Sequence, residues 1–246
     1  MKHPTYKSDK IVEALCEIRF IPHGEWDPTV FGSYYDLIKN EFPKKRTQEV
    51  RRFELRAEES AIKQSFCPPE LRMRFLAPDD SAMIQLARNL LVVNILRAYP
   101  SWGKFKPLIL KRVQDYSKAA DPKGIQRLGL RYINRYEFPT SDFDAQALFN
   151  VYPCVPKEIN GRARPFFMRV EHPYSDSERL VLTFGETDSG RKDVVAVLLD
   201  LDHVFLNLED MCPPDLSNKL ELAHDRVQGA FETCITDRIR ALLGGE

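Results

Sequence analysis

The sequence lacks several features that would place the protein in a familiar class at once. No apolar stretch approaches the roughly 18 residues of a membrane span, and the N-terminal residues have no apolar core for a secretion signal. The five cysteines form no CxxC pair, and Cys16 and Cys234 lie on apolar stripes. Buried, reduced thiols fit this pattern better than disulfides or a zinc site. We therefore expect a cytoplasmic protein that is not in a membrane.

Motifs of the common enzyme classes are also missing. The sequence has no Gly-x-Ser-x-Gly, His-Glu-x-x-His, Walker or dinucleotide-binding motif. His224 has the helical spacing of an apolar stripe, and the adjacent Asp202 and His203 would point to opposite faces of a strand. The sequence therefore leaves any catalytic residue unidentified, predicts no cofactor, and favours a binding protein over an enzyme.

The two signs of charge are unevenly distributed along the chain, although the formal net charge is zero. Residues 1–136 hold 25 Lys and Arg against 16 Asp and Glu, a difference of +9, and residues 137–246 hold 11 against 20, a difference of −9. Such halves either neutralise each other in the folded protein or present two patches of opposite sign. In the second case the basic half would meet an anionic ligand or partner.

Hydrophobic periodicity predicts both strands and helices. Strand-like alternation runs over 11–20, where Val12 is expected on the buried side, and over 126–138. Helical spacing runs over about 101–120 and 216–243. Further strands are expected at 50–57, 71–77, 82–88, 90–97, 166–172, 179–185 and 194–206, and shorter helices at 143–150 and after Asp27-Pro28.

The order of these elements repeats, so residues 1–124 and 125–246 are interpreted as two similar, pseudo-symmetric halves of a single domain. Strands joined as hairpins, with helices at intervals, predict an α+β fold with an extended, curved antiparallel sheet and helices packed on one face. The TATA-binding and helix-grip architectures are built in this way. A strongly curled sheet that closes towards a barrel is the alternative.

The predicted strands carry charged residues on the face opposite the apolar one. Glu13, Glu17 and Arg19 alternate with apolar residues, as do the arginines of 126–138. We interpret this face as a binding surface whose arginines hold phosphate or carboxylate groups by bidentate contacts. The candidate residues for ligand or partner binding are Glu13, Glu17, Arg19, Arg72, Arg74, Arg131 and Arg135. The plainer interpretation is a solvent-facing sheet in which Glu13 and Glu17 pair with arginines of 126–138.

Five segments resemble a family of sporadically distributed bacterial and archaeal proteins without an established activity. They are Ile11–Phe20, Trp26-Asp27, Tyr99–Trp102 leading into Phe105, Gly129–Arg135 and Leu199–Asp202. The resemblance covers most of the chain and implies a prokaryotic source, with the patchy distribution of mobile or defence-associated genes. It implies no catalytic residues. Together with the charged strands, it favours a binding or regulatory module with a protein partner.

Alternating charges on strands are also typical of triphosphate tunnel enzymes, which open with a Glu-x-Glu-x-Lys strand. Here the stretch is Leu15-x-Glu17-x-Arg19, so one carboxylate and the lysine are missing. Under this alternative the protein would be a metal-dependent phosphohydrolase or would bind a nucleotide or polyphosphate. Glu17, Asp200 and Asp202 would then hold Mg²⁺ or Mn²⁺.

Other features have simpler interpretations. Lys44-Lys45-Arg46 and Arg51-Arg52 would suit nucleic acid, but a sequence pI near 7 does not favour such a partner. The Cys-Pro-Pro motifs at Cys67 and Cys212 are expected to be stiff lead-ins and not nucleophilic sites. The 153–165 segment contains three prolines and is expected to be a long surface loop. The sequence leaves homodimer formation open.

Overall fold

The computed structural model describes residues 6, 10–50, 53–58, 61–66, 70–96, 98–156, 165–208 and 213–244. For 53–58, 61–66 and 213–214 it describes the backbone alone. Four features singled out in the sequence lie wholly or partly outside these residues: Arg51-Arg52, the motifs at Cys67 and Cys212, and the middle of the 153–165 segment.

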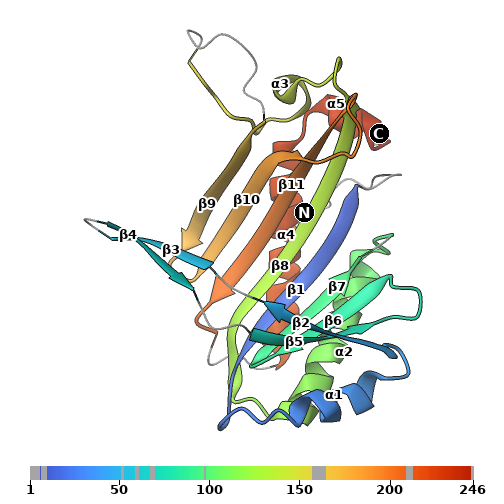
Figure 1. Ribbon diagram of the computed structural model, residues 1–246, viewed down its shortest axis with the longest axis vertical. Helices are drawn as coiled ribbons and strands as arrows, with labels where there is room; N and C mark the ends of the chain where they lie inside the picture. Colours follow the sequence, from blue (N-terminus) through green and yellow to red (C-terminus); the bar gives the residue numbers. More distant parts are fainter. Residues whose placement is uncertain are drawn as a thin grey trace.

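An antiparallel sheet of nine strands forms the body of the protein (Figure 1). From one edge to the other its strands are β2 (Lys44–Val50), β5 (Glu70–Leu76), β6 (Ala82–Ala87), β7 (Leu90–Ile95), β1 (Ile11–Ile21), β8 (Gly124–Pro139), β11 (Val194–Leu206), β10 (Glu178–Thr187) and β9 (Phe167–Ser175). In the part of the chain that is described, β2 and β9 stand at the two ends of this order, so the sheet is open and not a barrel. A separate hairpin joins β3 (Phe53–Glu58) to β4 (Ala61–Phe66).

Helices cover one face of the sheet, which confirms the predicted α+β class. They are α1 (Val30–Ile38), α2 (Trp102–Ala120), α3 (Ala145–Leu148), α4 (Pro213–Cys234) and α5 (Asp237–Leu242). Figure 1 shows α2 and α4 behind the strands, where α2 packs on β7 and α4 packs on β8 and β11. Within the described ranges, no helix combines the length and the apolar character that crossing a bilayer requires.

The strand order is the same on both sides of the sheet centre. Starting from β1 it continues to β7, β6 and β5, and starting from β8 it continues to β11, β10 and β9. A long helix closes each series, α2 after β7 and α4 after β11. β1 and β8 pair with each other, so the two series form one continuous sheet. The first series differs by the addition of β2 and of the β3–β4 hairpin.

Two expected elements differ in their bounds. In place of one strand at 50–57, β2 ends at Val50 and β3 begins at Phe53. β2 was not predicted, because its sequence, Lys-Lys-Arg-Thr-Gln-Glu-Val, has no alternation of apolar and polar residues. The expected helix at 216–243 is interrupted between Cys234 and Asp237. Thr236 donates its hydroxyl to the carbonyl of Leu148 (2.8 Å), which ties the interruption to α3.

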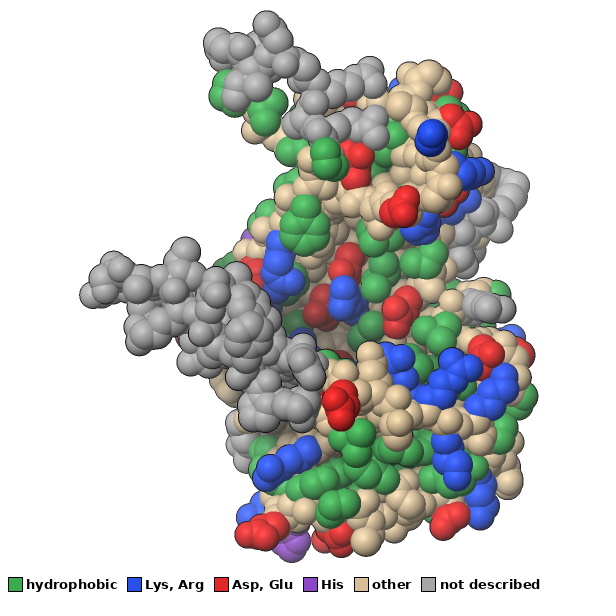
Figure 2. Space-filling view, viewed as in Figure 1, with side chains coloured by type: hydrophobic (Ala, Val, Ile, Leu, Met, Phe, Trp, Pro, Cys, Tyr) green, Lys and Arg blue, Asp and Glu red, His purple; other side chains and the backbone are tan. Residues whose placement is uncertain are grey.

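The face of the sheet opposite the helices carries the charges that the strand pattern predicts (Figure 2). We call it the charged face. Its polar and charged members include Glu13, Glu17 and Arg19 of β1, Arg46 of β2, Arg72 and Arg74 of β5, Gln85 of β6, Asn94 of β7, Arg127, Arg131 and Arg135 of β8, and Asp200 and Asp202 of β11. In Figure 2, acidic and basic side chains lie side by side over the middle of this face.

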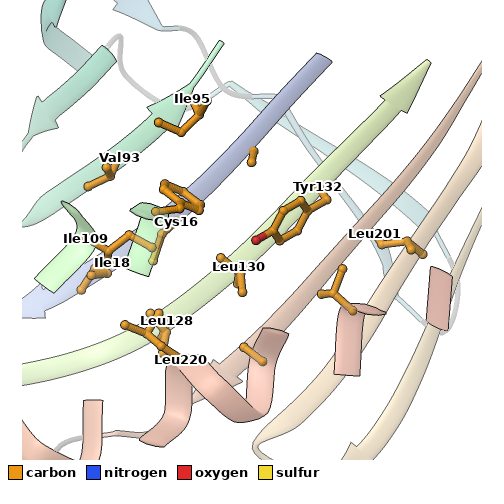
Figure 3. Close-up of a cluster of buried hydrophobic side chains, with 14 of the residues drawn as sticks. Cys16, Ile18, Val93, Ile95, Ile109, Leu128, Leu130, Tyr132, Leu201 and Leu220 are labelled. Atoms are coloured by element: carbon orange, nitrogen blue, oxygen red, sulfur yellow. The ribbon is translucent and has the colours of Figure 1, made fainter. Parts of the chain in front are cut away.

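The main hydrophobic core lies between the sheet and the helices (Figure 3). Ile18 and Leu130 from the central strands and Leu220 from α4 are fully buried in it. Burial of such a side chain stabilises the fold by about 1.5–3 kcal/mol. Cys16 is buried and unpaired, as expected, and burial raises the pKa of its thiol. The placement predicted for Val12 is wrong: it is 41% exposed, because the β1–β8 register shifts next to it.

Candidate functional site

All seven residues predicted to bind a ligand or partner lie on the charged face, but they fall into three separate groups. Glu13, Glu17, Arg19 and Arg131 lie at its centre on β1 and β8, and Arg72 and Arg74 lie on β5 near the β2 edge. Arg135 is further along β8, where it donates hydrogen bonds to Glu137 (3.0 Å) and to the carbonyl of Asp188 (3.0 Å). The three groups are therefore considered separately.

Glu17 joins two arginines at the centre. Arg19 and Arg127 are opposite each other on β1 and β8, which pair in antiparallel fashion. The carboxylate of Glu17 accepts from Arg127 Nη1 (2.7 Å) and from Arg19 Nε (3.0 Å). Arg127 also approaches Asp202 (3.7 Å). Two like charges that would repel each other across the strands are thus held by one shared carboxylate.

Gly129 makes room for this arrangement. A Cβ atom at this position would lie 3.1 Å from Arg127 Nη1 and 3.3 Å from Asp202 Oδ1. Both distances are closer than ordinary van der Waals contact, so a larger residue here would require Arg127 or Asp202 to shift by a few tenths of an ångström. A glycine inside a strand often marks such a close approach.

Arg131 is held by a different carboxylate from the one predicted. It donates two parallel hydrogen bonds to Asp200, from Nε (2.7 Å) and from Nη2 (2.5 Å). Glu13 instead accepts from the side chain of Asn94 (2.6 Å), which in turn accepts from Gln85 (3.1 Å). Asn94 was not predicted as a site residue, because it lies in the apolar run Leu-Leu-Val-Val-Asn-Ile, and it is fully buried.

Asp202 has the most perturbed acidity on this face. Burial raises its pKa to about 6, and the repulsion of Asp200 and Glu17 acts in the same direction, while Arg127 and Arg131 oppose it. His203, next in sequence, is fully buried on the helix side with Glu178 (3.1 Å), which confirms that the two side chains point to opposite faces. Asp202 and His203 therefore form no dyad.

The corner of the charged face at the β2 edge has a different balance of charge. Arg46 and Arg74 are opposite each other on β2 and β5. Neither has an ion pair with any described residue, and Arg74 Nε is buried without a hydrogen-bond partner there. Arg72 pairs with Glu70 on its own strand (3.3 Å). We call the Arg46–Arg74 pair the open arginine pair.

A hollow of about 270 Å³ lies at the end of β1, beside the turn between β6 and β7. Arg19 and Arg88 line it together with Glu70, whose carboxylate contacts Arg72. The hollow therefore reaches from Arg19 to the first residue of β5, the strand that carries Arg74.

The carboxylates that the tunnel-enzyme alternative assigns to a metal are each held by arginine. Asp200 is bound in a bidentate manner by Arg131, and Glu17 and Asp202 flank Arg127. Among the described residues, no three His, Cys, Asp or Glu side chains are grouped so that they could hold an ion. The predicted role of these carboxylates in binding Mg²⁺ or Mn²⁺ stays a prediction.

Comparison with known proteins finds no protein-family model and no curated protein that matches this chain. The interpretation of the charged face therefore depends on its own geometry.

Proposed function

We propose that the protein is a non-enzymatic binding module, and that the corner around the open arginine pair receives an acidic segment of a partner protein. One contrast carries the proposal. At the centre, Arg19 and Arg127 are joined by Glu17, whereas Arg46 and Arg74 have the same cross-strand placement without a described carboxylate. Like charges opposite each other destabilise a sheet. A partner carboxylate would take at the corner the place that Glu17 takes at the centre.

The centre of the face lies away from this corner, on β1 and β8, and offers an already ordered surface to a partner that extends across the sheet. Arg127 and Arg131 are already fixed by Glu17 and Asp200, so these long side chains lose little freedom when a partner binds. Ordering free side chains at an interface costs about 0.5–1.5 kcal/mol each, and a preformed surface avoids part of this cost. The distribution of charge fits the same proposal, since the basic excess lies in residues 1–136.

The resemblance to sporadically distributed prokaryotic proteins suggests a biological setting for this module. In this proposal it acts in the cytoplasm as the regulatory or neutralising partner in a mobile or defence-associated bacterial system. Its partner would then be a second protein of that system with an acidic segment. The resemblance supports the setting, and the arginine geometry supports the chemistry.

Thermal unfolding with a hexaglutamate peptide as the probe tests the proposal. A ligand that binds the folded state alone adds about 2.7 kcal/mol at 100 times its Kd, and each kcal/mol raises the Tm of a chain of this size by about 2–4 °C. We expect the peptide to raise the Tm of the wild type but not of Arg46→Gln or Arg74→Gln. Lys104→Gln, which removes one exposed charge on α2, is the matched control and should keep the shift. Equal shifts in all four proteins, or none in the wild type, would contradict the proposal.

The alternative is a polyphosphate or nucleotide ligand, because paired arginines also suit phosphate. The same measurement with tripolyphosphate and with short RNA, each with and without Mg²⁺ or Mn²⁺, separates these cases. A shift that needs both the metal and tripolyphosphate would support the metal-dependent phosphohydrolase. A shift with RNA alone would support nucleic-acid binding, and either result without a hexaglutamate shift would replace the protein-partner proposal.

A further inference from the structure

The edge strand β9 is unusually exposed for a strand of its length. Every residue from Arg169 to Ser175 is exposed, and the apolar side chains of Phe167 and Val170 are 74% and 49% exposed. β9 pairs with β10 on one side, and no described strand pairs with it on its other side. A long, exposed edge strand is a template for pairing with another strand.

The backbone of β9 shows which residues direct their hydrogen-bonding groups outwards. Glu186 donates its backbone amide to the carbonyl of Phe166 (3.0 Å), so the backbone carbonyl of Phe166 points towards β10. Because the backbone direction alternates along an antiparallel strand, Phe167, Arg169, Glu171 and Pro173 point their backbone groups away from β10. Pro173 fits this assignment, since a proline in a sheet is tolerated where its missing N–H would face solvent.

We propose that β9 pairs in antiparallel fashion with β9 of a second copy of this chain, about a two-fold axis at Val170. This register places Arg169 opposite the partner's Glu171, and Glu171 opposite the partner's Arg169. A shift by two residues in either direction, which keeps the same backbone pairing, puts Arg169 opposite Arg169 or Glu171 opposite Glu171. Opposite charges stabilise cross-strand pairs and like charges destabilise them, so charge selects the first register.

The same register also covers the exposed apolar side chains. On the charged-face side it places Phe167 opposite the partner's Pro173. On the helix side it places Val170 opposite the partner's Val170, and Tyr174, which is 36% exposed, lies at the end of the same row. The outward N–H groups of Phe167, Arg169 and Glu171 each gain a carbonyl partner. Charge, apolar contact and backbone bonding therefore agree on one arrangement.

This dimer is independent of the proposed function. β9 and β2 are the opposite ends of the sheet order, so the pairing leaves the open arginine pair uncovered. Its experiments can fail without affecting the peptide-binding proposal, and the reverse also holds.

Sedimentation velocity over a range of protein concentration tests the dimer. We expect the wild type to show a reversible monomer–dimer equilibrium. Arg169→Glu would place Glu opposite Glu, and Glu171→Arg would place Arg opposite Arg, so each variant alone should dimerise roughly tenfold more weakly or worse. Mixing the two variants restores Glu opposite Arg at both places, and the mixture should form a heterodimer. Lys104→Glu is the control for a charge reversal elsewhere and should dimerise as the wild type does.

Both variants also lose the ion pair between Arg169 and Glu171 within the chain (2.8 Å), and the mixing experiment accounts for this loss. A defect in folding would persist in the mixture, whereas a defect in charge pairing would be repaired. A wild type that stays monomeric at every concentration would overturn the proposal. Single variants that dimerise normally, or a mixture that stays monomeric, would overturn it as well.

Discussion

The centre and the β2 corner of the charged face place arginines in the same way but neutralise them differently. At the centre, Arg19 and Arg127 are opposite each other and share the carboxylate of Glu17. At the corner, Arg46 and Arg74 are opposite each other, and neither forms an ion pair with a described residue. A charged sheet surface is therefore not uniform. At its centre each arginine contacts a carboxylate, and at its corner two arginines face each other without a described one.

The largest effect is expected from a substitution that makes the centre resemble the corner. Glu17→Gln keeps the shape of the side chain but removes the charge that joins Arg19 and Arg127. Glu17 is only 22% exposed, so we expect the free energy of unfolding to fall by about 1–3 kcal/mol, as for other hydrogen-bonded charged groups. Urea denaturation measures this change. Glu137→Gln is the matched control. The two arginine contacts of Glu137 are near the surface, so losing them should lower the free energy of unfolding by less. An equal fall in the free energy of unfolding for the two variants would contradict the stabilising role of the central network.

Asp202 also lies at the centre, and burial makes its carboxyl group a weaker acid than usual. Its pKa of about 6 in the folded protein is above the ordinary value of 3.8, so the folded state holds this proton more tightly than the unfolded chain. The stability that this group contributes is therefore fully present below about pH 4 and is lost as the pH rises through 6. We expect the unfolding free energy of the wild type to fall over this interval by up to about 1.4 kcal/mol per pH unit relative to Asp202→Asn. Parallel pH profiles for the two proteins would show that Asp202 titrates normally.

Much of the fold could be predicted from the sequence, because β1 and β8 alternate, β6 and β7 are apolar along their length, and each long helix has an apolar stripe. The exceptions have physical reasons. β2 has polar residues on both sides, and the break after Cys234 leaves the helical spacing of Ile235 and Ile239 intact.

The contacts of the candidate site also divide into those that the sequence pattern predicts and those that it does not. The Glu17–Arg127 pair follows from alternation on β1 and β8, once these two strands are neighbours. The open arginine pair does not, because β2 pairs with β5 across the whole β3–β4 hairpin, and no local pattern reveals that pairing. Nor does the contact between Asn94 and Glu13, since both faces of β7 are buried.

The smallest change in stability is expected from a substitution that gives the corner a carboxylate of its own. Arg46→Glu places a carboxylate opposite Arg74, and an opposite-charge pair on neighbouring strands is worth roughly 0.2–1 kcal/mol, with like charges unfavourable. We therefore expect the unfolding free energy to rise by a few tenths of a kcal/mol or more, while the thermal shift caused by hexaglutamate disappears. Lys104→Glu makes the same charge change on α2 and should leave the peptide-induced shift in place.

A rise in stability together with a loss of binding would show that this corner was left unneutralised for a ligand. A fall in stability would mean that Arg46 is already compensated within the chain, and binding that survives the substitution would place the acidic partner elsewhere.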